Sequence, residues 1–195
     1  MKINFTRLSR WLHIYLSMIS FFIVLFFSIT GITLSHTDWF QSQVTNKSIE
    51  GKIDSSWTNQ TDTLKIDKLR ITEYFRNTQH AQGAVNDFRI DEREISFVFK
   101  GPGYEASIFV NREDGAFQFN ETNYGLVGKM NDLHKGRDTG RTWIWFMDAS
   151  AVFLILVSLT GLILLLFLKK KRLSGIIVSI LGVLVMYLVY YFWGV

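Results

Sequence analysis

Histidine is the residue type in this sequence that is best suited to cofactor chemistry, because neutral imidazole is a good ligand for haem iron. His13 and His36 lie near the two ends of one apolar segment, 23 residues apart. A helix rises ~1.5 Å per residue, so the two rings are predicted about 34 Å apart along its axis, one near each face of a membrane. His134 lies nine residues before Trp143, where a second apolar segment begins. We therefore expect His36 and His134 at the outer face and His13 at the inner face.

This spacing favours a non-covalently bound haem b, which is flat and apolar and needs no cysteine; the chain contains none. His36 and His134 are predicted to ligate the iron of one haem, and His13 is the candidate ligand of a second. Because no other histidine is predicted at the inner face, His13 would need a second copy of the chain or another ligand such as Met18. The alternative is that His13 and His36 are interfacial aromatic side chains and His134 is a loop residue.

Four basic side chains flank these histidines and are suited to the anionic propionates of haem. They are Arg10 beside His13, and Lys135, Arg137 and Arg141 around His134. No catalytic residues are predicted, because the sequence has no ordered Ser/His/Asp set, no glycine-rich phosphate loop and no cluster of histidines or carboxylates with metal-ligand spacing.

Three long runs without charge predict three membrane-spanning helices, since about 20 apolar residues cross the hydrocarbon core of a bilayer. The runs cover residues 11–37, 149–168 and 173–195. The first run is too long for a cleaved signal peptide, and no small-residue cleavage motif follows it. It is therefore expected to remain in the protein as an anchor.

The positive charge of the chain is concentrated beside these apolar runs. The formal net charge is +4, and the excess lies in residues 1–35 and in the cluster 169–172. This is the distribution that the positive-inside rule describes, and it argues against a nucleic-acid surface. Both clusters are predicted to face the cytoplasm, which places the N-terminus inside and the segment between the first two helices outside.

The segment between the first two membrane helices is predicted to be a small α+β domain. Residues 64–79 have apolar side chains at helical spacing, and residues 84–120 alternate apolar and polar side chains around two turn signals. A short strand is predicted around residues 48–53. The fold class is therefore membrane α-helical, with three transmembrane helices and a small α+β domain inserted between the first and the second.

The predicted organisation has seven parts. In chain order they are a cytoplasmic N-terminus (1–9), a first transmembrane helix (10–39), the outer domain (40–123), a connection that carries His134 (124–142), a second transmembrane helix (143–168), a basic cytoplasmic loop (169–172) and a third transmembrane helix (173–195).

One five-residue pattern occurs twice, once in each of the first two membrane helices. Residues 28–32 read Ser-Ile-Thr-Gly-Ile and residues 158–162 read Ser-Leu-Thr-Gly-Leu. The repetition suggests an internal repeat in two antiparallel neighbours. Gly31 has no side chain, so a neighbouring helix or a flat ligand could approach closely there, and helix packing is the simpler explanation.

Several short motifs also occur in a fixed order along the membrane segments. They are Arg10-Trp11-Leu12-His13, Thr30-Gly31-Ile32-x-Leu34, Ser35-His36-x-x-Trp39-Phe40, Leu133-His134-Lys135-Gly136 with Gly140, Trp143 and Asp148, and Leu159-Thr160-Gly161-Leu162. This ordered set resembles the short bacterial form of the PepSY-associated transmembrane proteins. The resemblance covers most of residues 7–168, and the outer domain is similar to a PepSY module.

Larger relatives in this family are inner-membrane haem proteins that reduce ferric siderophores on the periplasmic side. The resemblance implies a bacterial inner-membrane b-type haem protein, either a ferric-siderophore reductase or an electron-transfer subunit for iron uptake. It implies a quinol or cytoplasmic electron donor, and it places His13, His36 and His134 on histidine positions of the family. This chain has three helices instead of a longer set, so a homodimer is expected to complete the bundle. The alternative is a membrane-anchored PepSY module that binds a peptide or a peptidase without redox activity.

Overall fold

The computed structural model describes residues 5–194 and divides into two compact units. One unit holds the described residues up to Leu25 and from Asp148 onward, and the other holds Phe26–Met147. The helices are α1 (Phe5–Ser35), α2 (Lys68–Thr78), α3 (Gly125–Lys135), α4 (Arg141–Phe167) and α5 (Arg172–Trp193), with short 3-10 helices η1 (Thr37–Gln43), η2 (Ser55–Trp57) and η3 (Thr63–Lys65). The strands are β1 (Thr45–Lys52), β2 (Ala84–Ile90), β3 (Glu94–Gly101), β4 (Tyr104–Asn111) and β5 (Ala116–Asn123).

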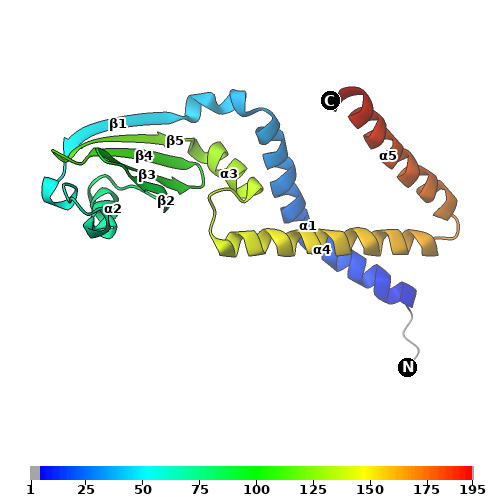
Figure 1. Ribbon diagram of the computed structural model, residues 1–195. Coiled ribbons are helices and arrows are strands. Elements are labelled where there is room, and N and C mark those ends of the chain that lie inside the picture. The colour runs from blue at the N-terminus through cyan, green and yellow to red at the C-terminus, as the bar shows by residue number, and fades with distance from the viewer. Residues whose placement is uncertain (1–4, 195) are drawn as a thin grey trace. The chain divides into compact units, whose positions relative to one another are not determined.

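Among the described residues, three helices are long and apolar enough to cross a membrane: α1, α4 and α5 (Figure 1). Few of their side chains are buried in the isolated chain, as expected for helices that face lipid. The prediction of three apolar helices is therefore confirmed. Helix α1 ends at Ser35, before the predicted end at residue 39, because His36 leaves the helical conformation and the chain continues into η1.

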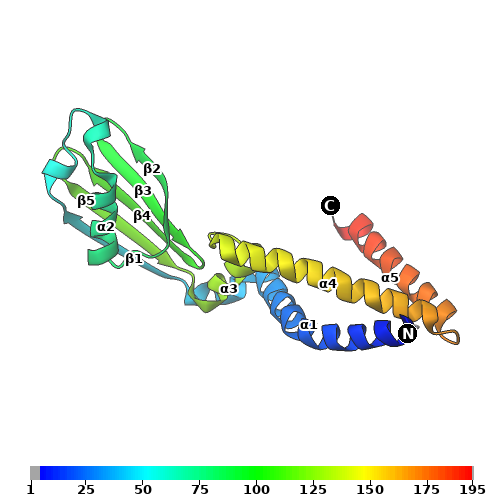
Figure 2. The ribbon, with the colours of Figure 1, turned by 90° about the horizontal axis from the view of Figure 1, so that it is seen from below.

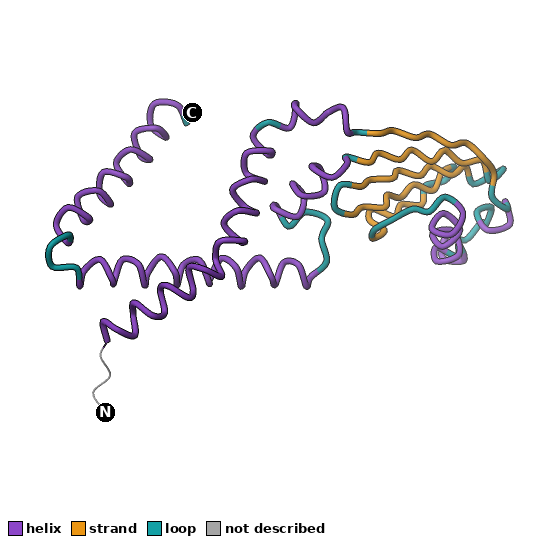
Figure 3. Tube along the Cα trace, turned by 180° about the vertical axis from the view of Figure 1, so that it is seen from behind, coloured by secondary structure: helices purple, strands orange, loops and turns teal. Residues whose placement is uncertain are grey.

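Five antiparallel strands form one sheet in the order β1-β5-β4-β3-β2. The strand nearest the N-terminus pairs with the last one, so that Thr45 lies opposite Asn123 and Lys52 opposite Ala116. Figure 3 shows β1 and β5 side by side at one edge of the sheet. The predicted short strand around residues 48–53 is therefore an edge strand that closes the sheet.

Buried and less buried side chains alternate along the strands, because one face of the sheet carries the hydrophobic core. In β3, Ile95, Phe97 and Phe99 are buried, and the residues between them are less buried. Phe97 lies opposite Ile108, and Ile108 lies opposite Phe119, so the register places large apolar side chains in rows across the sheet.

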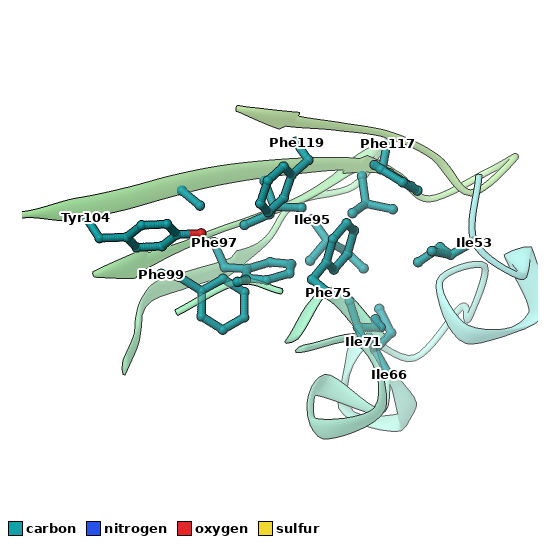
Figure 4. Packing of buried hydrophobic residues seen from close by; sticks show 14 residues of the cluster. Ile53, Ile66, Ile71, Phe75, Ile95, Phe97, Phe99, Tyr104, Phe117 and Phe119 are labelled. Atoms are coloured by element: carbon teal, nitrogen blue, oxygen red, sulfur yellow. The ribbon is translucent and has the colours of Figure 1, made fainter. Parts of the chain in front are cut away.

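Helix α2 covers this apolar face, as Figures 1 and 2 show. Ile71 and Phe75, one turn apart, are fully buried. In Figure 4 the Phe75 ring lies among rings from the strands, with its centroid 4.9 Å from that of Phe117. The helix begins at Lys68 and not at residue 64, because the Asp67 side chain accepts a hydrogen bond from the Arg70 N–H and caps the helix.

A buried arginine ties together three connections at the end of the sheet. The Arg112 guanidinium donates to the carbonyls of Gln60 at 2.6 Å, Asp91 at 2.7 Å and Glu92 at 3.1 Å. Its Nε also reaches the Thr58 carbonyl at 3.4 Å. A planar fork of five donors suits this task, because it can satisfy several carbonyls at once.

Helix α3 is fastened to the turn between β3 and β4. The Asp132 carboxylate accepts a hydrogen bond from the Gly103 N–H at 2.9 Å. Gly103 has a positive φ of 70°, and a Cβ there would lie 2.7 Å from the backbone of Lys129. Only glycine fits this turn, so the close approach of α3 to the sheet depends on it.

Candidate functional site

Two histidines each contact, at hydrogen-bond distance, the threonine of one copy of the repeated Ser-x-Thr-Gly motif (residues 28–32 and 158–162). His134 Nδ1, on α3, lies 2.5 Å from Thr30 Oγ1 on α1. His13 Nδ1, on α1, lies 3.1 Å from Thr160 Oγ1 on α4. Both rings are partly buried. We call these two arrangements the His134 site and the His13 site, and each lies within one of the two compact units.

The glycine of each motif faces the same histidine ring that the threonine binds. A Cβ on Gly161 would lie 2.9 Å from Cε1 of His13, whereas one on Gly31 would lie 3.8 Å from Cε1 of His134. The close approach that the sequence suggests at Gly31 is therefore made by a histidine ring from α3, at ordinary van der Waals distance. At Gly161 the ring is so close that any side chain would displace it.

The hydroxyl of each threonine is also bonded within its own helix. Thr30 Oγ1 donates to the Phe26 carbonyl at 2.6 Å, and Thr160 Oγ1 donates to the Val157 carbonyl at 2.8 Å. Such bonds to the preceding turn are common for threonine in helices and fix the orientation of the hydroxyl oxygen. The oxygen that meets each histidine is thus held in place by the helix that carries it.

Further contacts hold α3 against the end of α1. Asn131 lies one turn before His134, and its side-chain oxygen accepts a hydrogen bond from Thr33 Oγ1 at 2.6 Å. The Trp143 indole N–H donates to the Leu133 carbonyl at 2.8 Å. Two pairs therefore join the helices at the same spacing, since Thr30 and Thr33 face His134 and Asn131.

Aromatic and backbone features complete the His134 site. The Phe27 ring meets the imidazole edge to face at 5.0 Å between centroids. Gly136 ends α3 in the left-handed conformation, with a φ of 66°, directly after the histidine and Lys135. The ring therefore sits at the last turn of a short helix, against the side of α1.

His36 occupies a different environment from the other two candidate ligands. It is exposed, its Nδ1 lies 3.1 Å from the Ile32 carbonyl, and its ring stacks on Trp39 at 4.1 Å between centroids. Among the described residues, no hydrogen bond or ring contact joins His36 to His134. Ligation of one haem by both therefore stays a prediction.

The four basic residues predicted as propionate partners, Arg10, Lys135, Arg137 and Arg141, are all exposed. Arg137 pairs with Asp138 at 3.4 Å between Nε and Oδ2. The other three make no ion pair within residues 5–194. Their charges therefore remain available to an anionic group.

The part of the chain that the structure describes has no group of three or more His, Cys, Asp or Glu side chains suited to a bare metal ion. A haem requires only one or two ligands from protein. The sequence alone points to the histidines but misses Thr30, Thr160 and Asn131 as their neighbours. The repeated Ser-x-Thr-Gly motif is the signal that could have identified both threonines.

Comparison with known proteins gives one match. No curated protein and no solved structure matches the chain. The model of one protein family, described as "Putative PepSY_TM-like", matches residues 7–194. That match spans all three apolar helices and the five-stranded sheet between the first two of them. The chain therefore belongs to this family of PepSY-associated transmembrane proteins.

Proposed function

We propose that this protein is a b-type haem protein of the bacterial inner membrane that passes electrons to ferric iron in a periplasmic chelate such as a siderophore. The observation that carries the proposal is the arrangement of His13 and His134. Each ring has Nδ1 in a polar contact with a threonine, and its Nε2 makes no hydrogen bond among the described residues. Histidines that ligate metals characteristically engage the other ring nitrogen in this way.

The residues present fit a haem on chemical grounds. His36 also has its Nδ1 in a polar contact, although the partner is the backbone carbonyl of Ile32 and not a threonine. The exposed apolar sides of α1 and α4 supply surface for a flat apolar group, and Lys135 and Arg141 are exposed cations close to His134 in the sequence. When bound, haem b supplies reversible one-electron chemistry.

The contribution of the protein chain is ligation, orientation and electrostatics. We propose His134, with His36, for an outer haem and His13 for an inner one, with a quinol or cytoplasmic protein as electron donor. A second copy of the chain would supply the remaining ligand at the inner site and cover part of the exposed helix surface. No acid–base step is assigned to any side chain.

The proposed orientation rests on charge. Lys169, Lys170 and Lys171 lie in the connection between α4 and α5, and Arg172 begins α5; a connection this basic favours the cytoplasmic side. With the basic connection on the cytoplasmic side, the proposed orientation puts the sheet domain in the periplasm and the His134 site near the periplasmic face. This is the face at which a ferric chelate would arrive.

A membrane-anchored binding module is the second candidate function. One observation favours it: the face of the sheet that α2 leaves open has a broad pocket of about 610 Å³ at the ends of β1, β5 and β4. Glu50, Lys52 and the half-exposed Phe109 line it, which is a composition suited to a peptide. On this alternative the helices serve only as an anchor.

The absorption spectrum of the detergent-purified protein, oxidised and then reduced with dithionite, tests the proposal. A Soret band, a sharp reduced α-band and a pyridine haemochrome count close to stoichiometric are expected. His134→Ala and His13→Ala should each lower the count. His80→Asn is the matched control, because His80 is the fourth histidine, is exposed, and has a positive φ of 57° that asparagine tolerates. A protein that stays colourless when expressed with added haem would favour the binding module instead.

A further inference from the structure

The His13 and His134 sites are two copies of one arrangement. In each, a threonine and the glycine after it lie on one helix, and a histidine from another segment lies over both. In each, the threonine hydroxyl also lies within hydrogen-bond distance of a carbonyl in the preceding turn of its own helix. One arrangement is built on residues 28–32 and the other on residues 158–162. The two copies of the sequence repeat therefore share their atomic contacts as well as their residue types.

The direction of the hydrogen bonds in these contacts can be derived from the number of protons. A threonine hydroxyl has one proton and a carbonyl can only accept, so the proton of Thr30 Oγ1 is directed to the Phe26 carbonyl. The contact between Thr30 Oγ1 and His134 Nδ1 then requires a proton on the histidine nitrogen. By the same count, Thr160 Oγ1 donates its proton to the Val157 carbonyl, so its contact with His13 requires a proton on His13 Nδ1.

A neutral imidazole carries one ring proton, so a proton on Nδ1 leaves a lone pair on Nε2. We propose that Thr30 and Thr160 are positioning residues that hold His134 and His13 in the Nδ1–H tautomer and so present Nε2 as the donor atom to a metal-centred group. The inference rests on the proposed function for the identity of that group, a haem, but the tautomer itself does not depend on it.

The glycines determine how closely each ring can lie on its threonine. The ring of His13 lies where a Cβ on residue 161 would be, and the ring of His134 lies just outside that distance from residue 31. The Thr-Gly pair thus combines a hydrogen-bond acceptor with the space for a flat ring. This explains on physical grounds why both residues occur together in both copies.

The test uses the full-length protein in detergent without haem, labelled with ¹⁵N-histidine, in mildly alkaline buffer where imidazole is neutral. The nitrogen chemical shifts distinguish a protonated ring nitrogen from one with a lone pair. Spectra of His13→Gln and His134→Gln assign the two signals. Both histidines are expected as Nδ1–H tautomers with an unprotonated Nε2.

Thr30→Val replaces the hydroxyl with a methyl group of similar size, so His134 loses its acceptor. The His134 signal should then show a mixture of tautomers, while the His13 signal stays as in the wild type. In Thr160→Val the His13 signal should show the mixture and the His134 signal should stay unchanged. Thr30→Ser and Thr160→Ser keep the hydroxyl and should keep the wild-type tautomers. Unchanged signals in both valine variants would overturn the inference.

Haem titration separates this result from the proposed function. If the function holds, Thr30→Val should weaken haem affinity by roughly 10- to 100-fold and Thr30→Ser should restore it. Wild-type protein with both Nδ1–H tautomers and no haem binding would support the positioning role and contradict the haem proposal. Haem binding with mixed tautomers in the wild type would contradict the positioning role alone.

Discussion

The two histidine sites share their chemistry but differ in how they are held. The His134 site is embedded in a polar network, since Asn131 and Asp132 on the same helix bond to α1 and to the sheet. At the His13 site the ring is fixed by one hydrogen bond and by its closeness to Gly161. One site therefore depends on the folding of the sheet domain, and the other depends on the packing of small residues. The first three predictions below each affect one site and should spare the other, and the fourth concerns only the stability of the sheet domain.

The largest effect is expected from Arg112→Met. The change removes the donors to the Gln60, Asp91 and Glu92 carbonyls, which would destabilise the sheet domain by about 3 kcal/mol. Thermal unfolding followed by circular dichroism measures this loss, and the His134 signal in the ¹⁵N spectrum should broaden or shift with it. Arg93→Met is the control, because Arg93 is exposed on the neighbouring turn. If the His13 signal changed as much as that of His134, the two sites would not be independent.

Gly161→Ala is expected to have the next largest effect, and it acts on the other site. The new methyl group would overlap the His13 ring at 2.9 Å, so the ring must leave Thr160. The affinity for the proposed haem at that site should fall roughly 10- to 100-fold, as a haem titration would show. Gly31→Ala is the matched substitution, and its methyl group at 3.8 Å from His134 should leave affinity close to that of the wild type. Equal losses of haem affinity in Gly161→Ala and Gly31→Ala would contradict the steric difference between the two sites.

Asp132→Ala tests the connection between α3 and the sheet. The Gly103 N–H would lose its acceptor, at a cost of about 1–2 kcal/mol in the free energy of unfolding. Chemical denaturation measures that cost, and Glu92→Ala serves as the control, because Glu92 is exposed on the turn between β2 and β3. Haem affinity at the His134 site should fall several-fold while the His13 site is unaffected. Full affinity at both sites would show that the sheet does not help to position α3.

The smallest effect concerns pH. Burial, reinforced by the Glu121 carboxylate, raises the pKa of the Tyr104 phenol above its ordinary value. The folded domain therefore keeps the phenol neutral at a pH where the unfolded chain ionises it, and stability is lost as the pH rises above about 10. Tyr104→Phe should show a smaller drop in melting temperature between pH 8 and pH 10.5 than the wild type. An equal drop in both proteins would assign the alkaline loss to other groups.

Local patterns predicted much of the fold. The alternation of Ile95, Phe97 and Phe99 identified a strand with one buried face, and the charge-free runs identified three membrane helices. The helix in the outer domain was predicted four residues too long at its start, because Leu64 continues the apolar pattern but lies on the surface before the Asp67 cap. The pairing of β1 with β5 joins residues more than 60 positions apart, and no local pattern specifies it.

The candidate site was predictable only in part. Histidine chemistry and the repeated motif singled out His13, His134 and Gly31 from the sequence. The bonds from these histidines to Thr30 and Thr160 span 104 and 147 positions and arise only when the helices pack. The proximity predicted for His36 and His134 rests on their expected common level in the membrane, and it stays a prediction.

The pairing of Thr45 with Asn123 has a consequence for how this protein can vary. Paired residues on neighbouring antiparallel strands lie about 5 Å apart, so the chain enters and leaves the sheet domain at almost the same point. A domain joined in this way is an insert, and its loops or strands can be lengthened or trimmed while the ends that lead to α1 and α3 stay in place. The sheet domain is therefore free to diversify without displacing Thr30 or His134, as long as the Gly103 turn that binds Asp132 is kept.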